Sequence, residues 1–315
     1  MAELQNVFTW SASRHGTFQY CQRQYWWNYY GSWGGWSFDS PRPAREAYML
    51  KNLANRWTWP GTVVHEAIEA ILRRQLESSG QGQLGFDGGS GVDIEAEVEA
   101  ATELMRKQWV ESREGHYRRR PKKRFGLVEH EYDEHLSRAE WQAVNEKARD
   151  SLRSFLTSDL FERIRAMDPQ RWLPIEQLDQ FDFEGTGIWA VLDFAFRTED
   201  GAVEIYDWKT GRVTPDANKL QLGGYALYVG AKHDAEPSRV RTNLVYLGKD
   251  IQTFSFQMND KELTETRGEI RASIAAMRTR LFDKEGNVAR KEDFALTDDL
   301  QKCGMCAYRR LCGRD

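Results

Sequence analysis

Four cysteines constrain this chain more than any other feature of its sequence, because they lie at its two ends. Cys21 is close to the N-terminus, whereas Cys303, Cys306 and Cys312 fall within the last thirteen residues. Four thiolates are a complete ligand set for one metal centre, and the C-x2-C-x5-C spacing is more typical of metal binding than of disulfides in a chain without a secretion signal. Zinc and an iron–sulfur cluster both satisfy this pattern. We therefore expect the two terminal segments to meet in the fold.

The composition is that of a chain that can bury a large core and has no segment suited to a membrane. With 315 residues, it can form one elaborated domain or two smaller ones. Hydrophobic residues make up 40% of the chain, but uninterrupted apolar stretches such as residues 188–192 are far shorter than a bilayer span. The first residues carry no export signal. We expect a cytoplasmic protein that does not bind a membrane.

The spacing of apolar residues predicts groups of helices and strands. Helical periodicity covers six segments, namely residues 11–30, 61–76, 92–110, 137–164, 215–229 and 261–281. β-Branched and aromatic residues mark five strands, namely residues 173–184, 186–198, 203–208, 240–247 and 251–256. The strands gather in the second half of the chain, and this pattern indicates an α/β protein without an internal repeat.

The segments differ in composition, yet we expect residues 1–315 to form a single domain. It comprises an aromatic-rich N-terminal segment, a largely helical insertion, a sheet that carries the candidate site and a C-terminal cysteine segment, at residues 1–60, 78–170, 173–257 and 300–315 respectively. Residues 78–91 contain six glycines, and this composition predicts a flexible linker.

Two aspartates and a lysine in neighbouring strands form the strongest candidate for an active site. Asp193 lies in the sequence AVLDFAF, and Asp207 and Lys209 lie in IYDWKTG. Alternation along a strand places Asp207 and Lys209 on one face and Trp208 on the other, with the Trp208 carbonyl available as a ligand. Two carboxylates and a carbonyl suit Mg²⁺ or Mn²⁺, and a nearby ammonium can orient water or neutralise a phosphate. The pattern predicts phosphodiester hydrolysis.

His65 adds a nitrogen donor near the start of the helix predicted over residues 61–76. Glu69 follows one turn later on the same helix face. Taken alone, Asp207 and Lys209 are better explained as a surface ion pair on a solvated strand. The presence of His65 and of the four cysteines shifts the interpretation to an active site.

Positive charge is concentrated in one segment of a chain whose formal net charge is −4. Residues 113–124 contain seven Lys or Arg and one Glu. Such a cluster forms either a solvated loop or a track for phosphates that leads to the metal site. The residues of this segment that we assign to DNA binding are Arg118, Arg119, Arg120, Lys122, Lys123 and Arg124.

Tryptophans are concentrated in the N-terminal segment, where seven of the twelve lie before residue 60. We interpret most of them as a packed aromatic subdomain. Trp33 and Trp36 in the SWGGW stretch are the candidates for stacking on unpaired bases.

The order of the candidate residues resembles the RecB-like branch of the PD-(D/E)XK nucleases, from about residue 11 to residue 313. The motif residues in chain order are His65, Asp193, Asp207, Lys209, Gln221 and Tyr225. The opening and closing segments are similar to the four-cysteine iron–sulfur subgroup, which includes the CRISPR-associated RecB-like exonucleases and the AddB nuclease domain. These segments contain Ser11, Ser13, Phe18, Cys21, Tyr25 and Tyr29, and then Cys303, Cys306 and Cys312.

The resemblance implies a restriction-endonuclease-like fold, in which helices flank a mixed central sheet, and it implies a role for each motif residue. His65, Asp193, Asp207 and the Trp208 carbonyl would bind Mg²⁺ or Mn²⁺. Lys209 would position or activate the attacking water.

The remaining motif residues support the site or join the chain ends. Gln221 and Tyr225, one turn apart on one helix face, would contact DNA or support the site. The four cysteines would hold a [4Fe–4S] cluster that joins the N-terminal and C-terminal segments. We assign structural roles to Glu69 and Glu176.

These roles imply a metal-dependent deoxyribonuclease, and more narrowly an exonuclease on single-stranded DNA ends in DNA processing, recombination or CRISPR adaptation. One alternative is a non-catalytic nucleic-acid-binding module whose cysteines hold zinc. Another is a nuclease subunit that is active only with a partner, such as a CRISPR integrase or a helicase.

Overall fold

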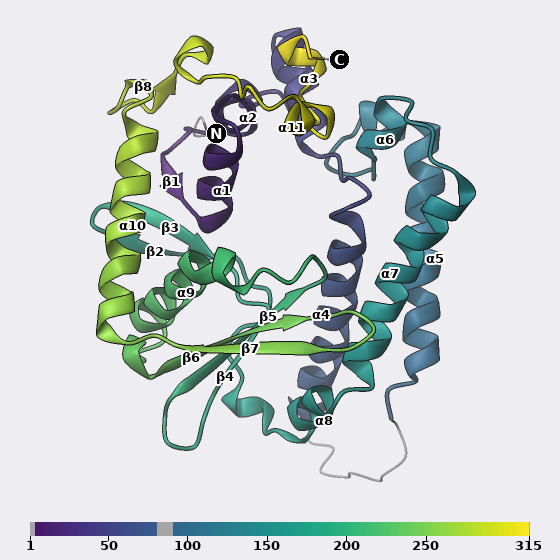
Figure 1. Ribbon diagram of the computed structural model, residues 1–315, viewed down its shortest axis with the longest axis vertical. Helices are drawn as coiled ribbons and strands as arrows, with labels where there is room; N and C mark the ends of the chain where they lie inside the picture. The colour runs from purple at the N-terminus through teal and green to yellow at the C-terminus, as the bar shows by residue number, and fades with distance from the viewer. Residues whose placement is uncertain (1–3, 81–90, 315) are drawn as a thin grey trace.

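The central feature of the fold is a four-stranded mixed sheet with helices against both faces. The computed structural model describes residues 4–80 and 91–314, so most of the predicted Gly-rich linker lies outside the described residues. The strands β4 (Phe194–Arg197), β5 (Val203–Lys209), β6 (Val240–Tyr246) and β7 (Gln252–Gln257) lie side by side in this order (Figure 1). Strands β5 and β6 are parallel, whereas the two outer pairs are antiparallel.

Two smaller sheets complete the strand structure of the described residues. The first has the order β1 (Thr9–Trp10), β3 (Thr186–Ala190) and β2 (Asp179–Phe183), with β1 parallel to β3. The second pairs β8 (Leu281–Asp283) with β9 (Val288–Ala289). Strand β1 thereby joins the N-terminal segment to the second half of the chain.

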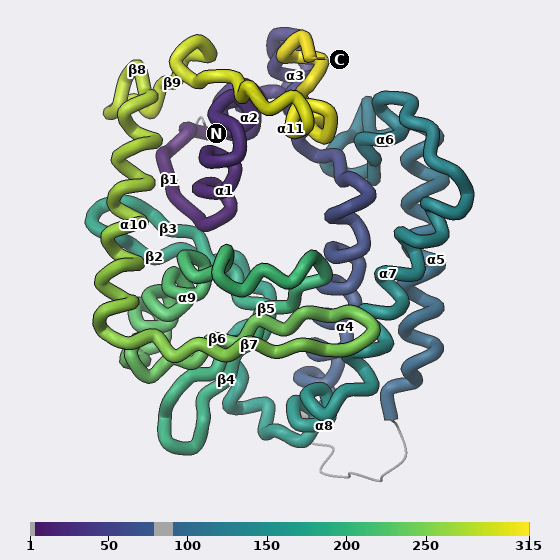
Figure 2. The backbone as a smooth tube through the Cα atoms, viewed as in Figure 1, coloured from purple at the N-terminus to yellow at the C-terminus, as the bar shows by residue number. Residues whose placement is uncertain are grey.

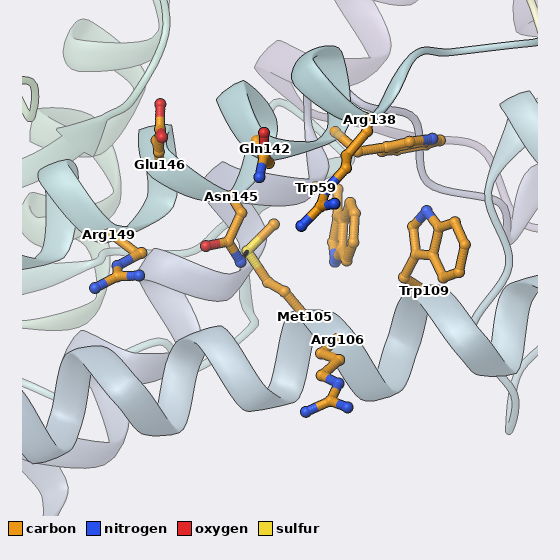
Figure 3. Close-up of a pocket in the computed structure, with 10 residues that line it drawn as sticks. Trp59, Met105, Arg106, Trp109, Arg138, Gln142, Asn145, Glu146 and Arg149 are labelled. Atoms are coloured by element: carbon orange, nitrogen blue, oxygen red, sulfur yellow. Dashed lines mark hydrogen bonds between the residues drawn. The ribbon is translucent and has the colours of Figure 1, made fainter.

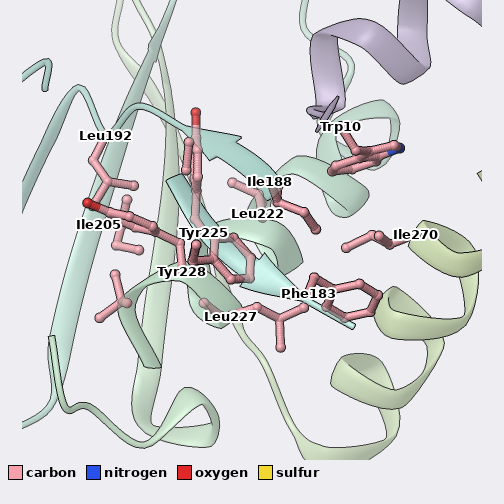
Figure 4. Packing of buried hydrophobic residues seen from close by; sticks show 14 of the residues in the cluster. Trp10, Phe183, Ile188, Leu192, Ile205, Leu222, Tyr225, Leu227, Tyr228 and Ile270 are labelled. Carbon is pink, nitrogen blue, oxygen red and sulfur yellow. The ribbon is translucent and has the colours of Figure 1, made fainter. Parts of the chain in front are cut away.

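One face of the central sheet packs on α9 (Lys219–Lys232), with α1 (Ala12–Tyr20) and α10 (Asp260–Arg278) beyond it. Ile205 of β5 points to this side and joins a core that also contains Leu222 of α9 and Ile270 of α10 (Figure 4). These three side chains are fully buried, so this layer is closed to water.

The other face packs on the helical insertion. Its helices are α4 (Trp59–Gly80), α5 (Ile94–Glu114), α6 (Val128–Glu131), α7 (Arg138–Leu156) and α8 (Asp159–Ala166). Trp208 of β5 points to this side and lies against Phe155 of α7, with ring centroids 4.9 Å apart. Because β5 alternates between two buried layers, it is a central strand in both sequence pattern and position.

The terminal segments meet, as the cysteine positions predict. Helices α2 (Gln22–Trp26) and α3 (Arg42–Lys51), with a π-helical turn over Trp27–Gly31, lie beside α11 (Leu300–Gly304), and the two chain ends are at the same end of the molecule (Figures 1 and 2). Tyr308 stacks on Trp27. Arg310 forms ion pairs with Glu46 of α3 and Glu131 of α6.

Three predicted elements are wrong in extent because side chains interrupt them. The helix predicted over residues 11–30 breaks at Cys21, whose backbone is extended. The helix predicted over residues 137–164 breaks before Ser158, whose hydroxyl caps α8 by accepting from the Phe161 N–H. The strand predicted over residues 186–198 divides into β3 and β4, which belong to different sheets.

Other differences concern short elements. The strand predicted over residues 173–184 is ordered as a strand only in β2, and α3 was not predicted. None of the described helices is both long enough and apolar enough to cross a membrane. Single turns of 3₁₀ helix lie at His116–Arg118, Pro169–Arg171, Pro215–Asn218, Pro237–Arg239, Lys291–Asp293 and Arg310–Cys312.

Candidate active site

The end of β5 brings one carboxylate and one ammonium to the same side of the sheet. Asp207 and Lys209 face α9 together with Ile205, whereas Trp208 faces the helical insertion. Asp207 is 2% exposed, and its Oδ2 lies 2.5 Å from Lys209 Nζ. The alternation predicted from the sequence is therefore present, but Asp207 is buried and Lys209 is half-buried, so the pair does not lie on a solvated strand.

Helix α9 fixes the orientation of Asp207 and Lys209. The Tyr225 hydroxyl donates to Asp207 Oδ1 at 3.0 Å, and Gln221 Nε2 donates to the same oxygen at 3.3 Å. Gln221 Oε1 accepts from Lys209 Nζ at 3.1 Å. Burial, and then the nearby carboxylates of Asp207 and Asp193, hold the pKa of Tyr225 well above its usual value, so its hydroxyl stays a donor.

Asp193 lies where the chain passes from β3 to β4. It is 7% exposed, and its Oδ2 accepts a 2.6 Å hydrogen bond from the Trp208 N–H. Burial, and then the neighbouring Asp207 carboxylate, raise the pKa of Asp193. Two buried carboxylates that repel each other are the situation that a divalent cation relieves.

Helix α4 directs His65 toward Asp193 and the end of β5. Its Nε2 lies 3.0 Å from the Trp208 carbonyl oxygen, and its Nδ1 lies 3.4 Å from Glu176 Oε1 and 3.5 Å from Asp193 Oδ1. Burial acts to lower the pKa of His65, but the two carboxylates together outweigh it and raise that pKa to about 10.

The residues present fit a divalent metal ion. Ligand atoms of His65, Glu176 and Asp193 all lie within 4.8 Å of one another. Asp207 Oδ2 is buried, and because its contact with Lys209 lacks hydrogen-bond geometry, it has no hydrogen-bond donor among the described residues. Carboxylate oxygens with one imidazole are donors that Mn²⁺ accepts, and the carboxylates suit Mg²⁺.

Glu176 enters this group although its sequence context does not mark it. It lies in the loop before β2 with a left-handed backbone (φ 47°), and its N–H donates to the Leu192 carbonyl. That bond places Glu176 beside the segment that carries Asp193. Glu69, in contrast, forms an ion pair with Arg73 one turn along α4 and lies outside the group.

The four cysteines line one small cavity where the terminal segments meet. Burial, more than the neighbouring thiols, raises the pKa of Cys306 to about 12. The Tyr308 N–H donates to Cys306 Sγ, and the Trp27 indole N–H donates to Cys312 Sγ at 3.3 Å. Sulfur atoms that accept N–H groups are typical of thiolate ligands in metal centres.

The basic segment divides into paired and unpaired cations. Arg118 pairs with Glu131 and Arg124 pairs with Glu111, each at 2.9 Å. The other four residues that we assign to DNA binding are exposed and form no ion pair within the part of the chain that the structure describes. These are Arg119, Arg120, Lys122 and Lys123.

The N-terminal tryptophans include both buried and exposed rings, and Trp57, which the sequence did not single out, is the most exposed at 56%. Trp10, Trp27 and Trp59 are buried. Trp33 and Trp36 are 40% and 47% exposed and touch each other edge to face, so both rings remain accessible.

The sheet and the residues at the end of β5 together define a metal-dependent nuclease. Two buried aspartates, a lysine held by a helical glutamine, and a histidine from a helix on the other side converge on one strand end. A family model of the PD-(D/E)XK nuclease superfamily matches residues 9–313, and the chain therefore belongs to this superfamily. The match spans every residue of the candidate active site. No curated protein matches the chain.

Proposed function

We propose that this protein hydrolyses phosphodiester bonds of single-stranded DNA and acts from strand ends. The supporting observation is the convergence of His65, Asp193, Asp207 and Lys209 on the end of β5. A divalent metal held by His65, Glu176 and the two aspartates would supply Lewis-acid activation of the phosphate and of a bound water. The resemblance to RecB-like exonucleases supports the choice of DNA ends.

The side chains around the metal ligands have separate tasks in this proposal. Lys209 Nζ, held between Asp207 and Gln221, orients the attacking water and neutralises charge that develops on the phosphate. Gln221 keeps Lys209 in this position. Tyr225 fixes the direction of the Asp207 carboxylate, because its hydroxyl donates to Asp207 Oδ1.

A cavity of about 490 Å³ beside α9 is suited to the strand next to the scissile bond. Gln221 and Tyr225 line one side of it, and Ser11 and Arg14 of the N-terminal segment line another. The Arg14 guanidinium lies over the Tyr29 ring at 4.2 Å and forms no ion pair with any described residue. A cation without a carboxylate partner beside the catalytic group favours a phosphate as its ligand.

We also propose that the cysteines hold a [4Fe–4S] cluster rather than one zinc ion. In a tetrahedral zinc site with Zn–S bonds of about 2.3 Å, the sulfur atoms lie ~3.8 Å apart. Within the described residues, which include all four cysteines, no three cysteine sulfurs lie within 4.8 Å of one another. The spacing therefore favours a larger centre. Purified protein should be brown, with iron and sulfide near four atoms each, by the stoichiometry of such a cluster.

The proposed activity is tested with end-labelled DNA. Purified protein should release nucleotides from single-stranded DNA in Mg²⁺ or Mn²⁺ and release none after chelation. Uncut single strands in both metals, with a bound zinc ion, would instead support the non-catalytic module. Cleavage that appears only after an integrase or a helicase is added would support the partner-dependent subunit. Circular single strands serve as the control, because an exonuclease leaves them intact.

The unpaired part of the basic segment is proposed as a phosphate track. Changing Arg119, Arg120, Lys122 and Lys123 to Gln should weaken single-strand binding and reduce the slope of log affinity against log salt by ~0.7 for each phosphate that the variant no longer binds. Turnover at saturating DNA should persist. Changing Arg118 and Arg124, which already have carboxylate partners, is the matched control with a smaller expected effect. An unchanged slope in the fourfold variant would identify the segment as a solvated loop.

A further inference from the structure

A second pocket lies in the helical insertion. It has a volume of about 410 Å³, which falls in the range of ~300–1,000 Å³ typical of small-molecule sites. Helices α5 and α7 form its sides, and Trp59 at the start of α4 lies between them (Figure 3). None of the residues that line it belongs to the candidate active site.

Three indole rings give this pocket its shape. The Trp141 ring stands at 75° to the Trp59 ring and at 82° to the Trp109 ring, with centroids 6.4 Å and 6.1 Å away. Trp59 is only 3% exposed, so the accessible flat aromatic surface comes from Trp109 and Trp141, which are half-buried. Flat apolar surface of this kind is suited to a planar ring.

One polar group in this pocket lacks a partner. Trp109 Nε1 is buried and makes no hydrogen bond with any described residue. A buried indole N–H without an acceptor is unfavourable, and the large majority of such groups are paired. Because this nitrogen is shielded from solvent, an acceptor can reach it only if the Trp109 ring shifts. The Arg113 guanidinium lies 5.1 Å from the Trp109 ring, so cationic charge is also present beside it.

The charged residues that line the pocket indicate which kind of planar ligand it fits. Arg106, Arg138 and Arg149 line the pocket together with a single carboxylate, Glu146. Arg106 lies near Glu103, but Arg138 and Arg149 form no ion pair with the residues that the structure describes (Figure 3). Aromatic cages for quaternary ammonium groups need the opposite charge balance. The rim favours an anion attached to the planar group.

We propose that this pocket binds one nucleotide of a strand, with its base against the indoles and the phosphates on its two sides on Arg138 and Arg149, which are eleven residues apart on α7. A nucleobase supplies the planar surface, and the phosphates supply the negative charge. The inference rests on the proposed function only for the source of the nucleotide, which we take to be the single-stranded substrate itself. Trp59 lies six residues before His65 on α4, a rise of about 9 Å, so one strand can reach both sites.

The test measures binding without cleavage, using the full-length protein in chelator and a fluorescent thymidine oligonucleotide. Arg138→Gln and Arg149→Gln should each weaken binding about tenfold, the loss expected for one charged hydrogen bond. Lys107→Gln on α5 is the matched control, because Lys107 is exposed and does not line the pocket. It should bind the oligonucleotide as the wild type does. Equal affinities for all four proteins would overturn the proposal.

A second comparison tests the stacking directly. Trp109→Leu should weaken binding about fivefold or more, because base stacking on an aromatic ring contributes ~1–3 kcal/mol. An abasic site is then moved along the oligonucleotide one position at a time. At one position it should weaken binding to the wild type. At the same position it should leave binding to Trp109→Leu unchanged. If Trp109→Leu does not fold, as judged by circular dichroism, the two arginine variants decide. An abasic scan with no sensitive position would contradict stacking in this pocket.

The source of the nucleotide is separated by titrating thymidine monophosphate into the wild type and the same variants. If the pocket variants weaken strand binding and the free nucleotide does not bind, the ligand of the pocket is a nucleotide of the strand. Free nucleotide whose binding is weakened in either arginine variant identifies a soluble ligand of the same chemistry. If every variant binds both the strand and the free nucleotide as the wild type does, the site is rejected. Absence of DNA cleavage by the wild type would overturn the proposed function but would leave these binding comparisons valid.

Discussion

At the scale of single residues, the site depends on groups that are costly to bury alone and favourable when they are combined. Asp207 has contacts to Lys209, Gln221 and Tyr225, and these contacts fix the direction of its carboxylate. Asp193 has only the Trp208 N–H and His65 to offset its burial among the described residues. The two aspartates therefore place carboxylate oxygens in a position that suits a divalent metal.

Replacing Asp207 tests this assignment. Asp207→Asn should reduce cleavage by orders of magnitude in Mg²⁺ and Mn²⁺, because the neutral amide is a poor metal ligand, while the protein stays folded and keeps its cluster. Asp250→Asn on an exposed loop is the control and should cleave normally. Rates are measured on labelled single strands and melting by circular dichroism. Normal cleavage by Asp207→Asn would remove Asp207 from the active site.

His130 should make stability depend on pH. Burial, and then the nearby Arg113, lower the pKa of His130 from 6.5 to about 4 in the folded protein. Between these values the unfolded chain binds a proton that the folded chain does not, so the free energy of unfolding falls as the pH drops from about 6.5 toward 4. His130→Gln should flatten this part of the profile, measured by urea unfolding at several pH values. A variant whose profile stays parallel to the wild type would show that His130 does not contribute.

The sequence was sufficient to find residues that share one strand or one helix face, but not residues that meet through loops. Alternation predicts that Asp207 and Lys209 lie together, and the four-residue spacing predicts the same for Gln221 and Tyr225. Glu176 reaches the site through a left-handed loop residue and a backbone bond to Leu192, and neither has a sequence signature.

At the scale of elements, the approach of α4 to β5 depends on one glycine. A Cβ at Gly61 would lie 2.7 Å from Thr210 Oγ1 but 3.9 Å from Thr210 Cβ. The threonine hydroxyl is therefore the atom that leaves no room for a side chain at Gly61. The absence of a side chain at Gly61 lets the first turn of α4 approach the end of β5, where His65 lies against the Trp208 carbonyl.

Adding a methyl group at Gly61 should separate the two elements. Gly61→Ala should reduce cleavage about tenfold or more by moving His65, since small misplacements of catalytic groups are costly. Combining it with Thr210→Ala removes the clashing oxygen and should restore most of the activity. Gly268→Ala on the exposed face of α10 is the control, because no atom lies within 4 Å of its added Cβ. A double variant as slow as Gly61→Ala would show that this contact does not position the site.

Element boundaries were the least predictable part of the fold because side chains define them. Periodicity continues through Cys21, yet the chain becomes extended there and turns the thiol toward the other cysteines. The run of strand residues continues through Asp193, yet its carboxylate takes the Trp208 N–H that a ladder partner would otherwise accept. In both places the interruption occurs at a residue of a functional site, where local pattern and tertiary role conflict.

At the scale of the whole molecule, the meeting of the chain ends joins three regions. Arg310 contacts Glu46 of the N-terminal segment and Glu131 of the insertion, and the Tyr132 hydroxyl donates to the Ala307 carbonyl. Cys21 and Cys303 are 282 positions apart in sequence but line the same cavity. A centre held by both therefore closes a loop that contains the entire candidate active site.

Cutting that connection should destabilise the whole protein rather than one segment. By analogy with a disulfide, closing a loop of this length contributes about 5 kcal/mol, so Cys21→Ser should lower the melting temperature markedly and release the bound iron. Arg310→Gln, which removes two ion pairs of a half-exposed guanidinium and no thiol, should have a much smaller effect, of about 1 kcal/mol, and should keep the iron. Melting is followed by circular dichroism and iron by elemental analysis. If Cys21→Ser melted with the wild type, the cysteine centre would have no role in holding the fold together.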